Sequence, residues 1–166
     1  MKTTAKKTGL AILFGVIILA QWAGASMAPK SAVSFGQALM DAEAVASTNP
    51  DWEVARVEGE SMAPFFGEHS ILVYGPEDFS RIQPGMTVVF DDGAGDLVAH
   101  RVLQLEKAGL WTRGTNNFRK DPALVTEENF RGVVIAVFHA QNVPVGNVYA
   151  SDGESLARVY GKSDRG

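Results

Sequence analysis

The sequence contains no cysteine and only three histidines in 166 residues. The absence of cysteine excludes disulfide bonds, thiolate metal sites and cysteine nucleophiles. The histidines, His69, His100 and His139, are widely separated and form no His-x-x-x-His pair, so the sequence predicts no metal site. No glycine-rich phosphate-binding loop occurs in the sequence, and no cofactor is expected. The net charge of −4 argues against non-specific binding to nucleic acid.

Long hydrophobic runs are also scarce, and the one that occurs lies near the N-terminus. Lys2, Lys6 and Lys7 precede an apolar run over residues 9–25. This layout is typical of a signal anchor or of a cleaved signal peptide, and small residues at the end of the run offer a cleavage site. We assign residues 1–28 to one of these two segments. Either segment sends the rest of the chain out of the cytoplasm. The anchor predicts a lipid membrane as partner and a single-pass protein with the following domain on the non-cytoplasmic side.

The remainder is predicted to be mainly β. Residues 34–46 combine a serine cap, a glutamine three residues later and apolar side chains at helical spacing, which predicts a short amphipathic helix lying near a membrane or against the domain. We assign residues 29–50 to this helix and a linker, 51–150 to a β-rich domain, and 151–166 to a polar tail that frays. Six short strands are expected, at residues 53–57, 71–74, 86–90, 97–105, 109–113 and 131–138. Strands at this spacing predict a coiled antiparallel sheet or barrel, preceded by one N-terminal hydrophobic helix.

One serine stands in a setting that suits a nucleophile. Residues 59–64 read Gly-Glu-Ser-Met-Ala-Pro, so Ser61 lies between a glycine and a proline that closes the turn. A serine on such a corner can present its hydroxyl and its own backbone N–H to one point, where the N–H would serve as an oxyanion donor. The alternative is an ordinary turn serine.

A serine nucleophile needs a base, and His100 is the candidate because it lies in an apolar, strand-like run. The alternative is a core histidine satisfied by one hydrogen bond, and His69 and His139 remain competitors. An acid that orients the histidine is also expected. Asp121 is the carboxylate that ends the polar loop after residue 113, although lone loop aspartates commonly form turns.

These segments, in this order, resemble the type I signal peptidases. Residues 57–64 resemble the nucleophile box of that family, residues 82–90 resemble its strand that runs into Val-Val-Phe, and residues 98–102 resemble the box that holds the base. That base is a lysine in most bacterial members and a histidine in the endoplasmic-reticulum and archaeal branch, so His100 points to the second branch. Residues 114–117 then resemble its Gly-Asp-Asn-Asn loop.

The resemblance implies a membrane-anchored serine endopeptidase that removes signal peptides from exported preproteins. It makes Ser61 the nucleophile, His100 the base and Asp121 the orienting acid. It also implies a coiled β peptidase domain that needs no cofactor. The residues expected to contact the substrate are Gly59, Met62 and Pro64.

One departure leaves other functions open. Thr115 replaces the first aspartate of the Gly-Asp-Asn-Asn loop, which puts the hydrogen bonds of that loop in question. An exported β-domain that has lost catalysis and acts as a binding module is one alternative. A relative of the self-cleaving repressor-type peptidases is another, but those use a lysine base and a DNA-binding domain, which the apolar segment and short helix before Ser61 do not match.

Overall fold

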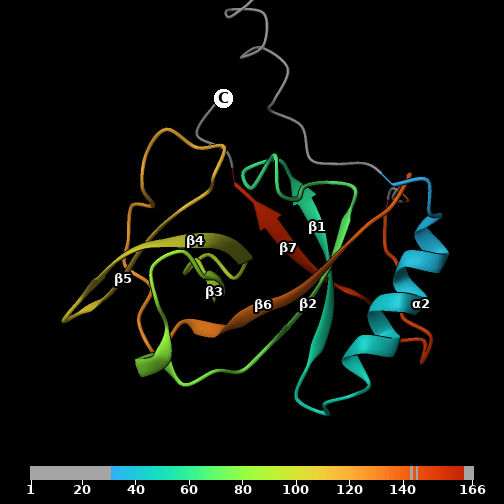
Figure 1. The fold of residues 1–166 in the computed structure, drawn as a ribbon, viewed down its shortest axis with the longest axis horizontal. Coiled ribbons are helices and arrows are strands. Elements are labelled where there is room, and N and C mark those ends of the chain that lie inside the picture. Colours follow the sequence, from blue (N-terminus) through green and yellow to red (C-terminus); the bar gives the residue numbers. More distant parts are fainter. Residues whose placement is uncertain (1–30, 143, 145, 163–166) are drawn as a thin grey trace, which may run out of the picture.

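The computed structural model describes residues 31–142, 144 and 146–162 (Figure 1). The hydrophobic helix expected within residues 1–28 lies outside this part of the chain. Within it, no helix has both the length and the apolar character needed to cross a membrane. The described elements, in chain order, are α2 (Phe35–Ala46), β1 (Glu53–Gly59), β2 (Ser70–Gly75), the 3-10 helix η1 (Phe79–Arg81), β3 (Thr87–Asp91), β4 (Leu97–Glu106), β5 (Gly109–Arg113), β6 (Phe130–His139) and β7 (Ala157–Gly161).

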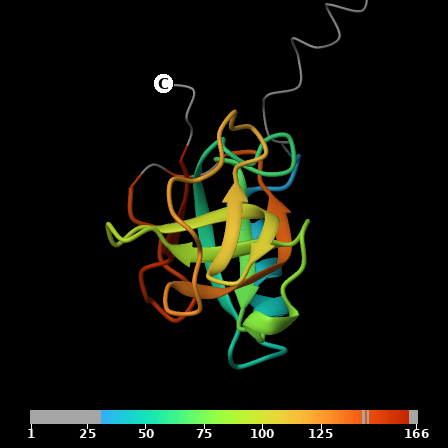
Figure 2. The same ribbon diagram turned by 90° about the vertical axis from the view of Figure 1, so that its left-hand side faces the viewer.

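Six of these strands close into a barrel. Neighbouring strands pair in the order β3–β6–β2–β1–β7–β4, and β4 pairs in turn with β3. The remaining strand, β5, pairs with β4 as a hairpin that faces the viewer in Figure 2. Each strand expected from the sequence is present, with ends that differ by no more than two residues. The mainly β, barrel-like fold is therefore confirmed.

Strand β2 divides the hydrophobic core into two parts, one against α2 and one inside the barrel. All of β2 is buried, because one of its faces meets α2 and the other meets the barrel interior. Ile71 and Val73 pack with the apolar face of α2, whereas Leu72 and Tyr74 pack inside the barrel. This division follows from the alternation of side chains along a strand. Each large apolar side chain buried in this way contributes about 1.5–3 kcal/mol to folding.

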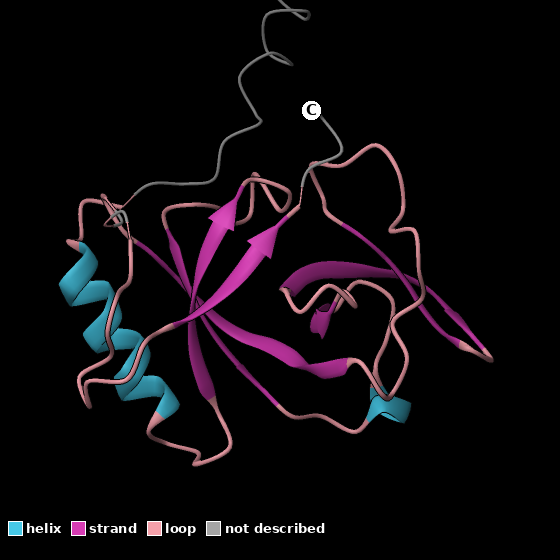
Figure 3. Ribbon diagram, turned by 180° about the vertical axis from the view of Figure 1, so that it is seen from behind, coloured by secondary structure: helices cyan, strands magenta, loops and turns pink. Residues whose placement is uncertain are grey.

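The helix begins where the sequence predicts. Ser34 Oγ accepts a hydrogen bond from the backbone N–H of Gln37 at 3.2 Å. The Gln37 side chain donates to Asp41 Oδ1 at 2.8 Å and does not return to the cap. α2 lies against β2 and β6, so of the two expected positions it takes the one against the domain (Figures 1 and 3). Its buried residues are Ala38, Leu39, Ala42 and Ala46.

The segment expected to be a polar tail contains β7, and this corrects two expectations. Residues 157–161 do not fray; they form a barrel strand that pairs in parallel with both β1 and β4, so the sheet is not purely antiparallel. The reason is Val159, which is 1% exposed and packs in the barrel core. The strand pattern of residues 157–161 is hard to see in the sequence because Arg158, next to Val159, is charged. The Arg158 guanidinium lies 3.6 Å from the carboxylate of Glu58 on β1.

Candidate active site

Ser61, His100 and Asp121 form one hydrogen-bonded chain. His100 Nε2 lies 2.9 Å from Ser61 Oγ, and His100 Nδ1 lies 2.8 Å from Asp121 Oδ2. A carboxylate can only accept, so Nδ1 carries the proton of the neutral ring and Nε2 can accept the serine hydroxyl proton. The exposed fractions of Ser61 and His100 are 0% and 1%.

The serine is held by the end of one strand and by a loop from elsewhere in the chain. β1 ends at Gly59, whose φ of +94° favours glycine, and Ser61 follows on the turn. The backbone N–H of Asn116 donates to Ser61 O at 2.6 Å, and Asn116 Nδ2 donates to Glu60 O at 3.0 Å. Two hydrogen bonds from Asn116 therefore hold the backbone carbonyls that precede and follow the Cα atom of Ser61.

The acid is positioned by a residue that the sequence analysis did not select. Thr112 Oγ1 donates to Asp121 Oδ2 at 2.7 Å, and the Asp121 backbone N–H donates to Thr112 O at 2.9 Å. Thr112 lies on β5 and is fully buried. A buried hydroxyl that bonds an ionised carboxylate orients it and stabilises its charge. A threonine inside a short apolar strand gives no sequence signal for this role, because threonine is common in strands.

The other two histidines lie elsewhere. His139 Nδ1 is 3.1 Å from the hydroxyl of Ser70, which makes a second serine–histidine pair at the ends of β2 and β6. Burial lowers the pKa of His139 below its usual value. His69 Nδ1 is buried, with no hydrogen-bond partner among the described residues. The structure therefore brings His100, and neither competitor, to Ser61.

Comparisons with known proteins show a partial likeness. The chain is 37% identical over 76 residues to signal peptidase I W of Bacillus subtilis. The matched part is 43% of this chain and 40% of that protein, so the chain spans about two fifths of the length of the curated relative. No protein-family model and no solved structure matches the chain. The likeness supports a distant relationship to a type I signal peptidase.

The three residues expected to contact substrate have different surroundings. Gly59 lies against the backbone of Gly161 on β7, so closely that a Cβ at Gly59 would collide with the Gly161 carbonyl. Met62 is 2% exposed and packs in the barrel core, whereas Pro64 is exposed. Met62 also lines a hollow of about 260 Å³ with Phe66 and residues of β3, β4 and β6. Their roles in binding stay predictions.

The loop that carries Thr115 is intact in spite of the substitution. The Thr115 backbone N–H lies 3.4 Å from the sulfur of Met62, and its hydroxyl lies 3.7 Å from the same sulfur. Asn117 N donates to Gly114 O at 2.9 Å and closes a turn. Because the contacts to Ser61 come from Asn116, the threonine does not remove the support of the serine.

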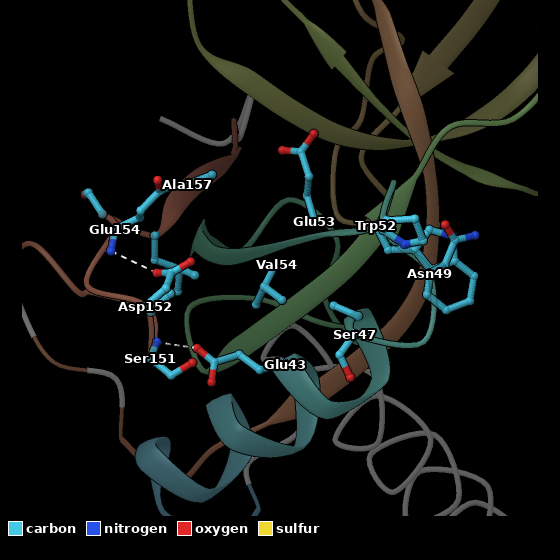
Figure 4. Close-up of a pocket in the computed structure, with 15 residues that line it drawn as sticks. Glu43, Ser47, Asn49, Trp52, Glu53, Val54, Ser151, Asp152, Glu154 and Ala157 are labelled. Atoms are coloured by element: carbon cyan, nitrogen blue, oxygen red, sulfur yellow. Dashed lines mark hydrogen bonds between the residues drawn. The ribbon is translucent and has the colours of Figure 1, made fainter.

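Two further hollows differ in their relation to the site. One of about 150 Å³ is lined by His100, Asp121, Pro122 and Lys162, beside the imidazole. Another of about 580 Å³ lies between α2, the start of β1 and the chain before β7, and Figure 4 shows Glu43, Trp52 and Asp152 around it. None of Ser61, His100 and Asp121 lines the second hollow.

Gly114 offers a direct test of how closely the loop must approach the serine. A Cβ at this position would lie 2.7 Å from Ser61 O and 2.8 Å from Ser61 Cβ, so a side chain would push the serine away. We expect Gly114→Ala to lower kcat by about 10²-fold, since a displacement near 1 Å at a reacting group has effects of this size. The unfolding free energy should fall by about 1–3 kcal/mol.

The matched control is Gly36→Ala on α2, where an added Cβ would meet no atom within 4 Å. This variant should keep its activity and its stability. Peptide cleavage and urea unfolding measured on both variants check the prediction; an unchanged kcat in Gly114→Ala would show that close approach of the loop is not required.

Proposed function

We propose that this protein is a serine endopeptidase of the type I signal peptidase kind, which cleaves signal peptides from exported preproteins. The observation that carries the proposal is the hydrogen-bonded chain of Ser61, His100 and Asp121, in which the serine and the histidine are buried. The partial identity with a signal peptidase supports the same reaction class. The histidine at position 100 supports the branch of the family in which histidine is the base.

In the proposed reaction Ser61 Oγ attacks the scissile carbonyl carbon, and His100 Nε2 accepts the hydroxyl proton. Asp121 stabilises the imidazolium that forms, and Thr112 holds the carboxylate in place. The Ser61 backbone N–H binds the oxyanion. His100 then gives the proton to the leaving amine, and a water molecule, activated by the same imidazole, hydrolyses the acyl-enzyme and restores Ser61.

The proposed substrate enters as an extended chain with small residues directly before the cut and two positions further back. We place the barrel on the non-cytoplasmic side of a membrane, with residues 1–28 as a single-pass anchor. Such an anchor would raise the local concentration of membrane-held preproteins near the serine. Gly59, Met62 and Pro64 are the proposed substrate contacts next to the nucleophile.

The test is processing of a reporter preprotein by the full-length chain in cells. The unaltered chain should shorten the reporter, and Ser61→Ala should abolish shortening. Ser70→Ala is the matched control, because Ser70 is also fully buried and also bonded to a histidine. Ser70→Ala should keep activity. Processing that survives Ser61→Ala, or no processing by the unaltered chain, would contradict the proposal.

A further inference from the structure

The proposed nucleophile and base are covered, and the cover is the C-terminal strand. A Cβ at Gly161 would lie 3.0 Å from Ser61 Oγ, so the backbone of β7 passes directly over the serine hydroxyl. The next residue, Lys162, is held by a hydrogen bond from Asn117 Nδ2 to its carbonyl oxygen at 2.8 Å. Lys162 also lines the hollow beside His100. A peptide therefore cannot reach Ser61 while β7 keeps this position.

The same strand lies between the two strands that lead to the reacting groups. β1 runs into the turn of Ser61, β4 carries His100, and β7 pairs with both of them in parallel (Figures 1 and 3). Removal of β7 would open the barrel along one line and expose the backbone edges of β1 and β4. An extended peptide can bind such edges by adding a strand.

In its register against β1, β7 occupies the positions that a substrate strand would have to take. Gly161 is opposite Gly59 at the end of β1, and Val159 is opposite Val57. Gly161 is small and lies against Ser61, and Val159, two positions earlier, points into the core. Gly161 matches the small residue expected directly before the cut in the proposed substrate, and Val159 takes the position two residues further back. We infer that β7 is an intramolecular ligand of the peptide-binding groove, which a substrate strand must displace; this inference rests on the proposed function.

The contacts of β7 allow it to leave while the chain before it stays. One of its residues, Val159, is buried, and the others are half-buried. The connection from β6 is anchored separately, because the Ser151 N–H donates to Glu43 Oε1 on α2 at 2.8 Å (Figure 4). Val148 and Leu156 of the same connection pack with the buried face of α2.

An ion-pair cluster holds the end of the strand, in addition to the hydrogen bond from Asn117 to the Lys162 carbonyl. Lys162 Nζ is bonded to Asp92, and it lies 3.0 Å from Asp96 Oδ2. The hydrogen bond from Lys162 keeps the pKa of Asp92 below its usual value. Both partners of Lys162 are in the turn between β3 and β4, so this cluster fixes β7 to the strand that carries His100. Salt screens an exposed pair of this kind, so high ionic strength weakens this part of the attachment of β7.

A disulfide staple tests the inference. Glu58 and Tyr160 are opposite each other in β1 and β7, and opposed positions in neighbouring strands have a Cα separation of about 5 Å, which a disulfide can span. The chain has no cysteine of its own, so Glu58→Cys/Tyr160→Cys forms one defined bond. The matched control is Glu53→Cys/Tyr74→Cys, which joins β1 to β2 at the other end of β1.

The probe is a fluorescein-labelled peptide with the sequence of residues 155–162, and its binding is measured by anisotropy in the Ser61→Ala background of the full chain. The β1–β7 staple should weaken binding at least tenfold when it is oxidised, and reduction should restore it. The control protein, with the staple between β1 and β2, should bind the peptide with equal affinity when oxidised and when reduced. A control peptide in which aspartate replaces the valine of position 159 should bind neither the β1–β7 stapled protein nor the β1–β2 stapled protein.

Equal affinity in the oxidised and reduced β1–β7 protein would overturn the inference, as would the absence of binding in both states. Far-UV circular dichroism of both states checks that the staple leaves the barrel folded. Cleavage is measured separately, with Ser61 intact. Redox-dependent binding without cleavage of the reporter preprotein would refute the proposed function and leave the role of β7 standing.

Discussion

Replacing His100 with alanine should lower kcat/KM for a signal-peptide substrate by roughly 10⁴-fold. The imidazole is the group in contact with Ser61 Oγ that can accept its proton, and without it the hydroxyl is a weak nucleophile at neutral pH. Steady-state cleavage of a fluorogenic peptide, with the fold checked by circular dichroism, measures the loss. The double variant Ser61→Ala/His100→Ala should be no slower than either single variant, because the two residues act as one unit.

His139→Ala is the control for this prediction. His139 also lies beside a buried serine, but its hydrogen bond goes to Ser70 and not to Ser61. Its removal should affect stability and leave kcat/KM within about threefold, since it touches no proposed reacting group. Comparable losses in both histidine variants would point to folding, and not to catalysis, as the role of His100.

Replacing Asp121 with asparagine should lower kcat by about 10²- to 10⁴-fold with a small change in KM. An asparagine can turn its NH₂ group toward His100 Nδ1, which would then become an acceptor and leave Nε2 protonated. In that tautomer the imidazole cannot take the proton of Ser61. The effect is therefore on the chemical step, and pre-steady-state measurement of acylation should show it directly.

Two comparisons sharpen the Asp121 prediction. Thr112→Val removes the hydroxyl that donates to the carboxylate but leaves the charge, so its loss should be about tenfold. Asp78→Asn changes an exposed cap of η1, and it should leave kcat unchanged. An Asp121→Asn enzyme with full kcat would show that the histidine needs no acid for orientation.

Most of the barrel follows from local patterns in the sequence. The run at 86–90 is β-branched and bounded by Pro-Gly and Asp-Asp-Gly turns, and both properties are visible without any knowledge of the neighbours. The same holds for 97–105 and for the capped helix at 34–46. Turn residues and the alternation of apolar and polar side chains therefore predict six strands, because both signals come from residues that are close together in the chain.

The parts that could not be predicted depend on contacts between distant residues. β7 contains Arg158 and Tyr160, and it becomes a strand because β1 and β4 offer it two edges, which lie about 100 and about 60 residues earlier in the chain. Thr112 is unremarkable until the fold brings Asp121 beside it. Ser61, His100 and Asp121 were selected from the sequence, and Asn116 lies in the loop motif at 114–117, whereas Thr112 belongs to no motif.

The packing of α2 on the barrel has a consequence for any membrane-held substrate. α2 begins at Phe35 and is fixed against β2 and β6, so the tether between an anchor ending at residue 28 and the folded domain spans at most roughly 20 Å. Under the proposed anchoring, a tether of this length would keep Ser61 within a limited distance of the bilayer. The distance of a peptide bond from the lipid surface would then limit its cleavage, in addition to the side chains around that bond.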